Sequence, residues 1–255
     1  MARFAIDAPE RESVRGGLLS VARVVDAPRE ALYLGVRYIM GDVSPPAPIP
    51  AEGEDKDFGV FDDTASSDPF TLYKGIEYPM LLGETPDVEA LFAAGETYGV
   101  EKAVQAQVLN PFAQDITPTP GTPVTNIKYA FGLLEQYAAD YYSGLPLLHG
   151  NKLAISLASE FLADSGAGTL HSKLGTPIAV GGGYGAVGPV DGSDVAITAG
   201  AGEAWLYITG GVTILRGPLD VYPTANLKAN RGLALAERTY VPIVDGIVAA
   251  ILVGI

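Results

Sequence analysis

The strongest chemical pattern in this chain is a cluster of glycines in its second half. Gly183, Gly185 and Gly188 match the spacing G-x-G-x-x-G, which in nucleotide-binding proteins lets the backbone approach a phosphate. Such a site also requires a helix to begin directly after the loop, because the helix N-terminus holds the anion. Here Pro189 and Asp191 follow, so the spacing predicts a glycine-rich turn. A glycine-rich α/β enzyme that binds a nucleotide through this loop stays an alternative.

The other reactive side chains do not form a catalytic or metal-binding pattern. His149 and His171 are the only histidines, and neither has a second histidine or an acid at helical spacing. The chain contains no cysteine, which excludes disulfides, thiolate nucleophiles and zinc–thiolate sites. No serine lies in a G-x-S-x-G nucleophile elbow. We therefore expect no catalytic, cofactor-binding or metal-binding residue, and a protein that is not an enzyme.

The charge distribution disfavours nucleic-acid binding and favours contacts between protein surfaces. The net charge is −14, whereas a nucleic-acid groove needs clustered Lys and Arg. Residues 51–100 contain twelve acidic residues and two lysines, while residues 1–50 contain six acids and six arginines. This contrast predicts complementary contacts between copies of the chain, since opposite charges bring surfaces into register. Only 18% of the residues are charged, which indicates that neighbouring copies cover part of the surface.

The N-terminal third is expected to be extended. Four prolines between positions 45 and 50 favour a polyproline path, so residues 1–50 are expected to form an arm. Residues 51–83 are expected to form a two-stranded ribbon, with strands at Phe58–Phe61 and Phe70–Tyr78. A ribbon of this kind buries no core of its own. We therefore expect residues 1–83 to be completed by other copies.

The rest of the chain is expected to contain both helices and strands. Thr85–Asn110 reads as a long helix, with Thr85 as N-cap and Pro86 in the first turn. A second helix is expected at Ile127–Tyr142, where apolar residues fall on one face. The apolar run Ile247–Ile255 is far shorter than the ~20 residues of a membrane span, so we expect no membrane segment. Further expectations are a strand at Lys152–Ser156, a short helix at Leu157–Ala163, a hairpin of Ala204–Thr209 with Val212–Arg216 across Gly210–Gly211, and strands at Leu233–Val241 and Ile247–Val253.

Several strings, in this order, resemble the major capsid proteins of tailed bacteriophages, in particular those of actinobacterial phages. That fold is shared with encapsulin shells. The likeness covers nearly the whole chain. The strings are DPFTLYKGI (68–76), GETYGVE (95–101), GTPIAVGGGYG (175–185), AWLYITGGV (204–212) with RG (216–217), and Asn230 followed by LAERTY (235–240).

The resemblance implies an α+β fold of four parts, the tailed-phage major capsid fold. Its parts would be an N-terminal arm (1–50), an extended β-ribbon loop (51–83), a peripheral domain with the spine helix and β-strands (84–111 and 201–255), and a mixed α/β axial domain (112–200). The function implied is a structural virion protein that self-assembles into pentamers and hexamers of an icosahedral capsid enclosing phage double-stranded DNA. An encapsulin-like nanocompartment shell is the alternative with the same fold.

Partners and contact residues follow from the same resemblance. The chain would bind copies of itself, with scaffolding, portal and decoration proteins as further partners, and would enclose DNA without specific binding. It would be assembled in the bacterial host cytoplasm and reside in the virion capsid. Non-covalent contacts are the default, although Lys56 and Asn230 are the residue types of an isopeptide bond found in some members. The residues expected at subunit interfaces are Arg15, Arg23, Lys56, Phe58, Phe61, Asp62, Asp63, Phe70, Tyr73, Glu96 and Glu101.

Overall fold

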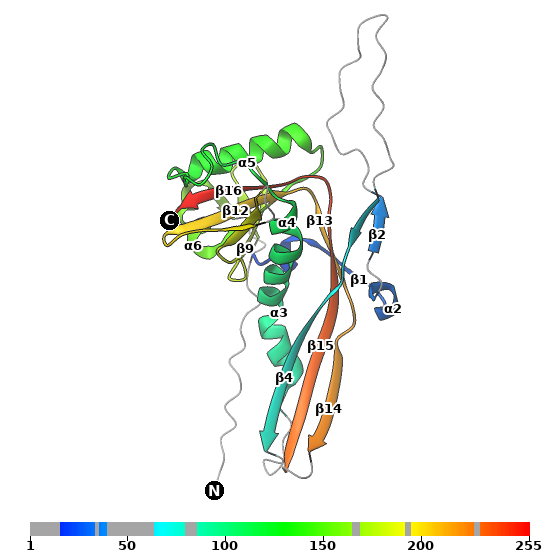
Figure 1. Cartoon of the computed structure of the whole chain (residues 1–255). Helices are drawn as coiled ribbons and strands as arrows, with labels where there is room; N and C mark the ends of the chain where they lie inside the picture. Colours follow the sequence, from blue (N-terminus) through cyan, green and yellow to red (C-terminus); the bar gives the residue numbers. More distant parts are fainter. Residues whose placement is uncertain are drawn as a thin grey trace, which may run out of the picture.

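The computed structural model describes residues 16–33, 36–39, 64–79, 86–164, 169–191, 195–226 and 230–255. An elongated sheet runs alongside one long helix, and a second, more compact α/β part lies at one end of both (Figure 1). Within these ranges, no helix is long and apolar enough to cross a membrane.

The elongated sheet is built around β15 (Arg231–Val244). On one edge, β15 pairs with β4 (Phe70–Pro79) along all ten residues of β4. On the other edge, it pairs with β14 (Asp220–Asn226) and then with β13 (Val212–Arg216). β1 (Arg23–Asp26) adds to β13 in parallel. The N-terminal segment and the C-terminal strands therefore belong to one sheet.

A long helical segment accompanies this sheet. α3 (Val88–Val104) continues through a π-helical stretch (Gln105–Leu109) into α4 (Asn110–Phe112). The side chain of Asp87 caps the segment by accepting a hydrogen bond from the backbone N–H of Ala90 at 2.9 Å. The predicted long helix is confirmed, but its predicted start is wrong, because the cap lies two residues after Thr85 and Pro86 precedes the helix.

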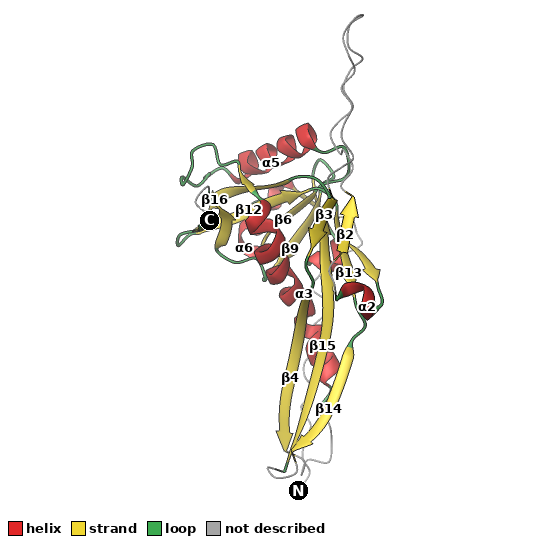
Figure 2. Ribbon diagram, turned by 45° about the vertical axis from the view of Figure 1, so that its right-hand side comes forward, coloured by secondary structure: helices red, strands yellow, loops and turns green. Residues whose placement is uncertain are grey.

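One face of the elongated sheet is covered by α3 (Figures 1 and 2). Phe92 of α3 packs against Ala234 and Ala236 of β15, whose small side chains let the helix lie close to the strand. The C-terminal end of α3 packs into the largest of the hydrophobic cores, where Val100 and Val104 are fully buried. The opposite face of β15 carries Glu237 and Thr239, which belong to the polar cluster described in the next section.

The compact part contains a seven-stranded sheet with helices packed on it. α5 (Ile127–Tyr141) is capped by Asn126 and confirms the predicted second helix. A two-stranded sheet of β10 (Val187–Val190) and β11 (Ala196–Thr198) lies outside the larger sheet. In spatial order the seven strands are β5 (Gln114–Asp115), β16 (Val248–Gly254), β12 (Glu203–Thr209), β6 (Leu147–Asn151), β9 (Pro177–Gly181), β8 (Leu170–Ser172) and β7 (Leu162–Asp164).

The central strands of this sheet are buried on both faces. Along β12, Trp205 and Tyr207 enter the core shared with α3, while Leu206 and Ile208 enter the core shared with α5. Successive strand side chains point to opposite faces, so burial on both sides requires a nearly continuous apolar run. The strings AWLYI (204–208) and VAAILV (248–253) provide such runs.

The expected hairpin across Gly210 and Gly211 is wrong. β12 pairs with β6 and β16 in the compact part, whereas β13 pairs with β1 and β15 in the elongated sheet. The two glycines therefore carry the chain from one sheet to the other. A Cβ atom at Gly210 would lie 1.5 Å from the carbonyl oxygen of Asp245, so the crossing has no room for a side chain.

The segment after β6 also differs from expectation. Lys152–Ser156, expected as a strand, belongs to helix α6 (Lys152–Leu157). The side chain of Asn151 caps this helix by accepting a hydrogen bond from the N–H of Ala154 at 2.8 Å. The helix expected at Leu157–Ala163 is reduced to a 3₁₀ turn, Ser159–Phe161, followed directly by β7.

Part of the N-terminal segment packs on its own chain, contrary to expectation. α1 (Leu18–Val21) and α2 (Arg29–Leu32) each place a fully buried leucine, Leu18 and Leu32, within the chain's own fold. The strand partner of β4 is β15, and Phe58–Phe61, the expected partner, lies outside the described residues. A ribbon does form elsewhere, where β2 (Val36–Ile39) pairs with β3 (Thr64–Ser67).

Candidate functional site

The glycine-rich loop is held in place by side chains of the long helical segment. Glu101 accepts hydrogen bonds from the backbone N–H of Gly183 at 3.0 Å and of Leu18 at 3.2 Å. A Cβ atom at Gly181 would lie 1.8 Å from the Glu101 carboxylate, so glycine is needed for this approach. Burial raises the pKa of Glu101, and the two N–H groups oppose that rise.

A second side chain of the same segment fixes the other end of the loop. Gln105 accepts from the N–H of Gly185 at 2.7 Å and donates to the carbonyl oxygen of Val187 at 2.9 Å. The residues after the loop form β10, and no helix begins there. The N–H groups of Gly183 and Gly185, which a phosphate loop would direct at its ligand, therefore already donate hydrogen bonds to Glu101 and Gln105. A Cβ atom at Gly183 would lie 2.5 Å from the backbone oxygen of Tyr98 on α3, and one at Gly188 would lie 2.0 Å from the indole nitrogen of Trp205 on β12. These two glycines therefore serve close packing, as the sequence predicted for a glycine-rich turn.

His149 lies on β6 inside the seven-stranded sheet, with two hydroxyls beside its ring. His149 is fully buried, and its ring nitrogens lie 3.0 Å from the hydroxyl of Tyr184 and 2.9 Å from that of Thr209. Burial lowers the pKa of His149 to about 3, so the ring is neutral at ordinary pH. Across the described ranges, no group of three or more His, Asp or Glu side chains could hold a metal ion.

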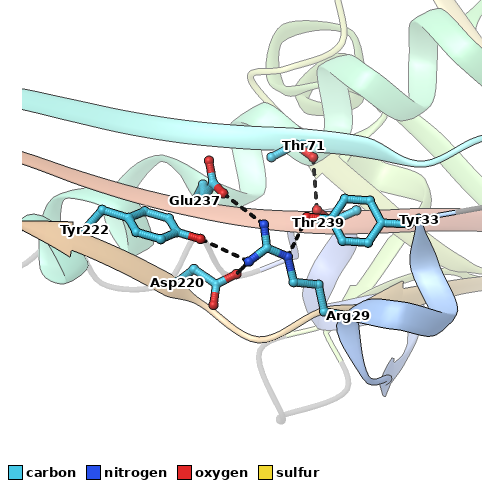
Figure 3. Close-up of polar contacts among 7 residues, drawn as sticks. All are labelled: Arg29, Tyr33, Thr71, Asp220, Tyr222, Glu237 and Thr239. Atoms are coloured by element: carbon cyan, nitrogen blue, oxygen red, sulfur yellow. Dashed lines mark hydrogen bonds and ion pairs between the residues drawn. The ribbon is translucent and has the colours of Figure 1, made fainter.

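The outer face of the elongated sheet carries a polar cluster centred on Arg29 of α2 (Figure 3). Its guanidinium lies 3.0 Å from the carboxylate of Asp220 and 3.4 Å from that of Glu237. It also donates to the hydroxyls of Tyr222 at 3.0 Å and Tyr33 at 2.6 Å, and these bonds raise its pKa further. One arginine thus joins α2 to both β14 and β15.

Three of the predicted interface residues have their partners within the subunit. Phe70 is 9% exposed and stacks on Tyr240, with ring centroids 5.3 Å apart. Glu101 is 1% exposed. Glu96 binds Arg238 at 2.7 Å and accepts a hydrogen bond from the hydroxyl of Tyr240 at 2.6 Å. These side chains already have partners within their own chain, so their role in contacts between copies stays a prediction.

The other predicted interface residues fall into two groups. Arg23 on β1 and Tyr73 on β4 are exposed, Tyr73 by 75%. The remaining six lie outside the described residues, and their role stays a prediction. They are Arg15, Lys56, Phe58, Phe61, Asp62 and Asp63.

Sequence reasoning missed a set of exposed apolar side chains on the compact part. Leu174 is 80% exposed, Leu145 67% and Leu153 59%. Single exposed leucines are ordinary, but several large exposed apolar side chains in one part of a chain are candidates for contact with another molecule. The only sequence signal was the low share of charged residues. The periodicity of short segments could not show which leucines face outward.

Comparisons with known proteins identify the fold. No family model matches the sequence, and no curated protein matches it either. Among solved structures, the capsid of an empty GTA particle matches with a TM-score of 0.59 at 11% identity, covering 100% of this chain and 95% of that one. The capsid of the cyanophage P-SCSP1u matches with a TM-score of 0.53 at 9% identity, covering 98% and 91%. The holo-SrpI encapsulin of Synechococcus elongatus matches with a TM-score of 0.56 at 12% identity, covering 98% and 91%.

These likenesses define the class of structure to which the chain belongs. It has the α+β fold shared by tailed-phage capsid proteins and encapsulins, which confirms the fold class that the sequence strings predicted. The match extends over the compact part, the elongated sheet and the spine helix together, because nearly the whole length of each chain is covered.

Proposed function

We propose that this chain is a structural shell subunit, the major capsid protein of a tailed bacteriophage. The observation that carries the proposal is the end-to-end match of the fold to capsid subunits, 100% of this chain against 95% of the GTA capsid chain. The engagement of the glycine loop by Glu101 and Gln105 supports a non-enzymatic role. Copies would assemble into pentamers and hexamers of an icosahedral capsid that encloses double-stranded DNA.

The proposal also assigns a role to each part of the subunit. Residues 112–200 would surround the capsomer axes, and residues 84–111 with 201–255 would form the peripheral domain. Residues 1–50 and 51–83 would reach neighbouring copies, except that 18–32 and 70–79 pack on the subunit's own chain. Scaffolding, portal and decoration proteins are the further partners. Assembly would take place in the bacterial cytoplasm, and the mature location would be the virion capsid.

Electron microscopy of the purified full-length protein tests the proposal. We expect closed icosahedral particles that release a single band of 26.5 kDa on denaturing electrophoresis, since the contacts are proposed to be non-covalent. A ladder of covalently linked subunits would contradict the non-covalent contacts. A protein that stays monomeric under all assembly conditions would overturn the shell function, and a nucleotide bound by the monomer would favour the enzyme alternative.

An encapsulin-like nanocompartment is the second candidate function. It is favoured by the match to the SrpI encapsulin, whose TM-score of 0.56 is close to that of the GTA capsid. The two functions differ in what the particles contain. Nuclease-protected DNA in particles isolated from the natural source supports the capsid, whereas an enclosed protein supports the nanocompartment.

The exposed leucines of the compact part provide a mutational prediction. Replacing Leu145 and Leu174 with serine should change the stability of the isolated subunit by no more than about 0.5 kcal/mol per site, because both are at the surface. The same double substitution should reduce the yield of closed particles severely, since each contact recurs in every copy of the shell. Urea denaturation measures the first effect and light scattering the second. Normal particle yield would show that these leucines lie outside the subunit contacts.

A further inference from the structure

The cluster around Arg29 places two carboxylates side by side on neighbouring strands, an arrangement that needs a nearby positive charge. Asp220 and Glu237 are direct neighbours in the register of β14 and β15, and both carboxylates lie on the outer face of the sheet. Like charges directly opposite each other on paired strands repel and destabilise the pair. The guanidinium of Arg29 lies against both carboxylates and offsets this repulsion.

The contacts of Arg29 also use the geometry that distinguishes arginine from lysine. Its Nε donates to Tyr33, one terminal nitrogen contacts both Tyr222 and Asp220, and the other contacts Glu237. A planar guanidinium can serve these directions together, whereas the ammonium of lysine acts as a compact point charge. The ring of Tyr33 further packs against the guanidinium, whose central carbon lies 5.2 Å from the ring centroid.

α2 has few other attachments to the sheet. It is a single helical turn of four residues, and Leu32 is its one buried side chain. The strand before it is tied to β13, and the N–H of Ala27 bonds the carbonyl oxygen of Arg216 at 2.9 Å. The strand after it, β2, pairs only with β3 among the described residues. The ribbon has a second attachment, because β3 continues through Asp68 and Pro69 into β4. α2 is therefore one of the two elements that set the direction in which the β2–β3 ribbon leaves the elongated sheet.

We propose that Arg29 is a positioning residue that clamps α2 to the outer face of the elongated sheet and thereby fixes the β2–β3 ribbon for assembly. The assembly part of this statement rests on the proposed shell function, and the clamp itself does not. About one third of the Arg29 side chain is exposed, and exposed ion pairs add little to global stability. The effect is therefore local, on a short segment with a low opening free energy.

Hydrogen exchange of the full-length protein tests the clamp. Arg29→Ala should make the amides of residues 27, 29–33 and 36–39 exchange about five- to tenfold faster, and Arg29→Lys should give a smaller increase. Arg231→Ala is the matched control, because Arg231 forms an exposed ion pair with Glu77 at 3.5 Å on the same sheet, away from α2. Raising the salt from 50 mM to 1 M should speed exchange of the same amides in the unsubstituted protein but not in Arg29→Ala.

Particle formation is measured on the same three variants. Arg29→Ala should yield fewer closed shells with a broader distribution of diameters, while its midpoint of urea denaturation stays near that of Arg231→Ala. Unchanged exchange in Arg29→Ala would overturn the clamp, whatever the protein assembles into. Faster exchange with normal shells would overturn the assembly role alone. Faster exchange in a protein that never forms shells, with or without the substitution, would support the clamp and contradict the shell function.

Discussion

Glu101→Ala should lower the free energy of unfolding by about 2–6 kcal/mol, because it leaves two buried backbone N–H groups without a partner. These groups belong to Leu18 and Gly183, which lie in the N-terminal segment and in the glycine-rich loop. One carboxylate thus joins three parts of the chain that are far apart in sequence. Urea denaturation of the chain in its monomeric form provides the measurement.

Glu101→Gln separates the hydrogen bonds from the charge. The amide keeps one acceptor oxygen, but its nitrogen would face a backbone N–H, so one of the two bonds is lost. We expect a loss of about 1–3 kcal/mol, smaller than that of the alanine variant. Lys102→Ala is the matched control, since Lys102 is the next residue of α3 and is exposed, and it should change stability by less than about 0.5 kcal/mol.

The burial of the Glu101 carboxylate opposes the stabilisation from these hydrogen bonds. Whether Glu101→Gln has a lower or a higher free energy of unfolding than the unsubstituted chain decides which effect is larger. Burial raises the pKa of Glu101, so desolvation makes the charged form less favourable in the folded protein than in water. If Glu101→Gln were more stable than the unsubstituted chain, the desolvation of the carboxylate would outweigh the hydrogen bond that is lost. The loop would then be held mainly by Gln105 and by packing.

Local patterns allowed a good part of this fold to be predicted. The two long helices and the strands β4, β15 and β16 have clear periodicity or β-branched and aromatic composition, and the structure contains all of them. The prediction of a hairpin at residues 204–216 was wrong, because a Gly-Gly pair between two apolar runs is also typical of a segment that crosses from one sheet to another. The choice between these depends on pairing with residues 231–254, which short-range rules do not contain.

The functional residues were harder to predict than the elements. Glu101 was expected at a subunit interface from the capsid resemblance, whereas its partners are backbone amides 82 and 83 residues away in its own chain. A signal was present, since Glu101 lies one turn before Gln105 and two turns before the buried Val108. The Arg29 cluster had no such signal, because its members come from three separate segments that meet only in the folded sheet.

Acidification from pH 7 to pH 5 should cost the folded chain about 2 kcal/mol through His149 alone. In the unfolded chain this histidine takes up a proton near its ordinary pKa of 6.5, whereas burial lowers its pKa to about 3 in the folded state. A group with a lowered folded-state pKa stabilises the fold at high pH, and this stability is lost as the pH falls below 6.5. The loss continues until the pH approaches 3.

His149→Gln removes the titrating ring and isolates this contribution. We expect the variant to be less stable at pH 7, by about 1–3 kcal/mol, because the hydrogen bonds to Tyr184 and Thr209 are disturbed. Between pH 7 and pH 5, however, it should lose about 2 kcal/mol less than the unsubstituted chain. Tyr184→Phe is the matched control, since it removes one hydrogen bond to the ring but leaves the ring to titrate, and it should keep the original pH dependence.

The position of His149 gives this titration its structural consequence. It lies on β6, which pairs with β12 on one side and β9 on the other, so a proton can reach the ring only when the centre of the seven-stranded sheet opens. The nearest groups are hydroxyls, which offer the imidazolium no countercharge. An equal pH dependence in His149→Gln and the unsubstituted chain would mean that the ring is protonated without unfolding. Water would then have to enter the sheet between β6 and β12, and the neutral, dry environment inferred for His149 would be wrong.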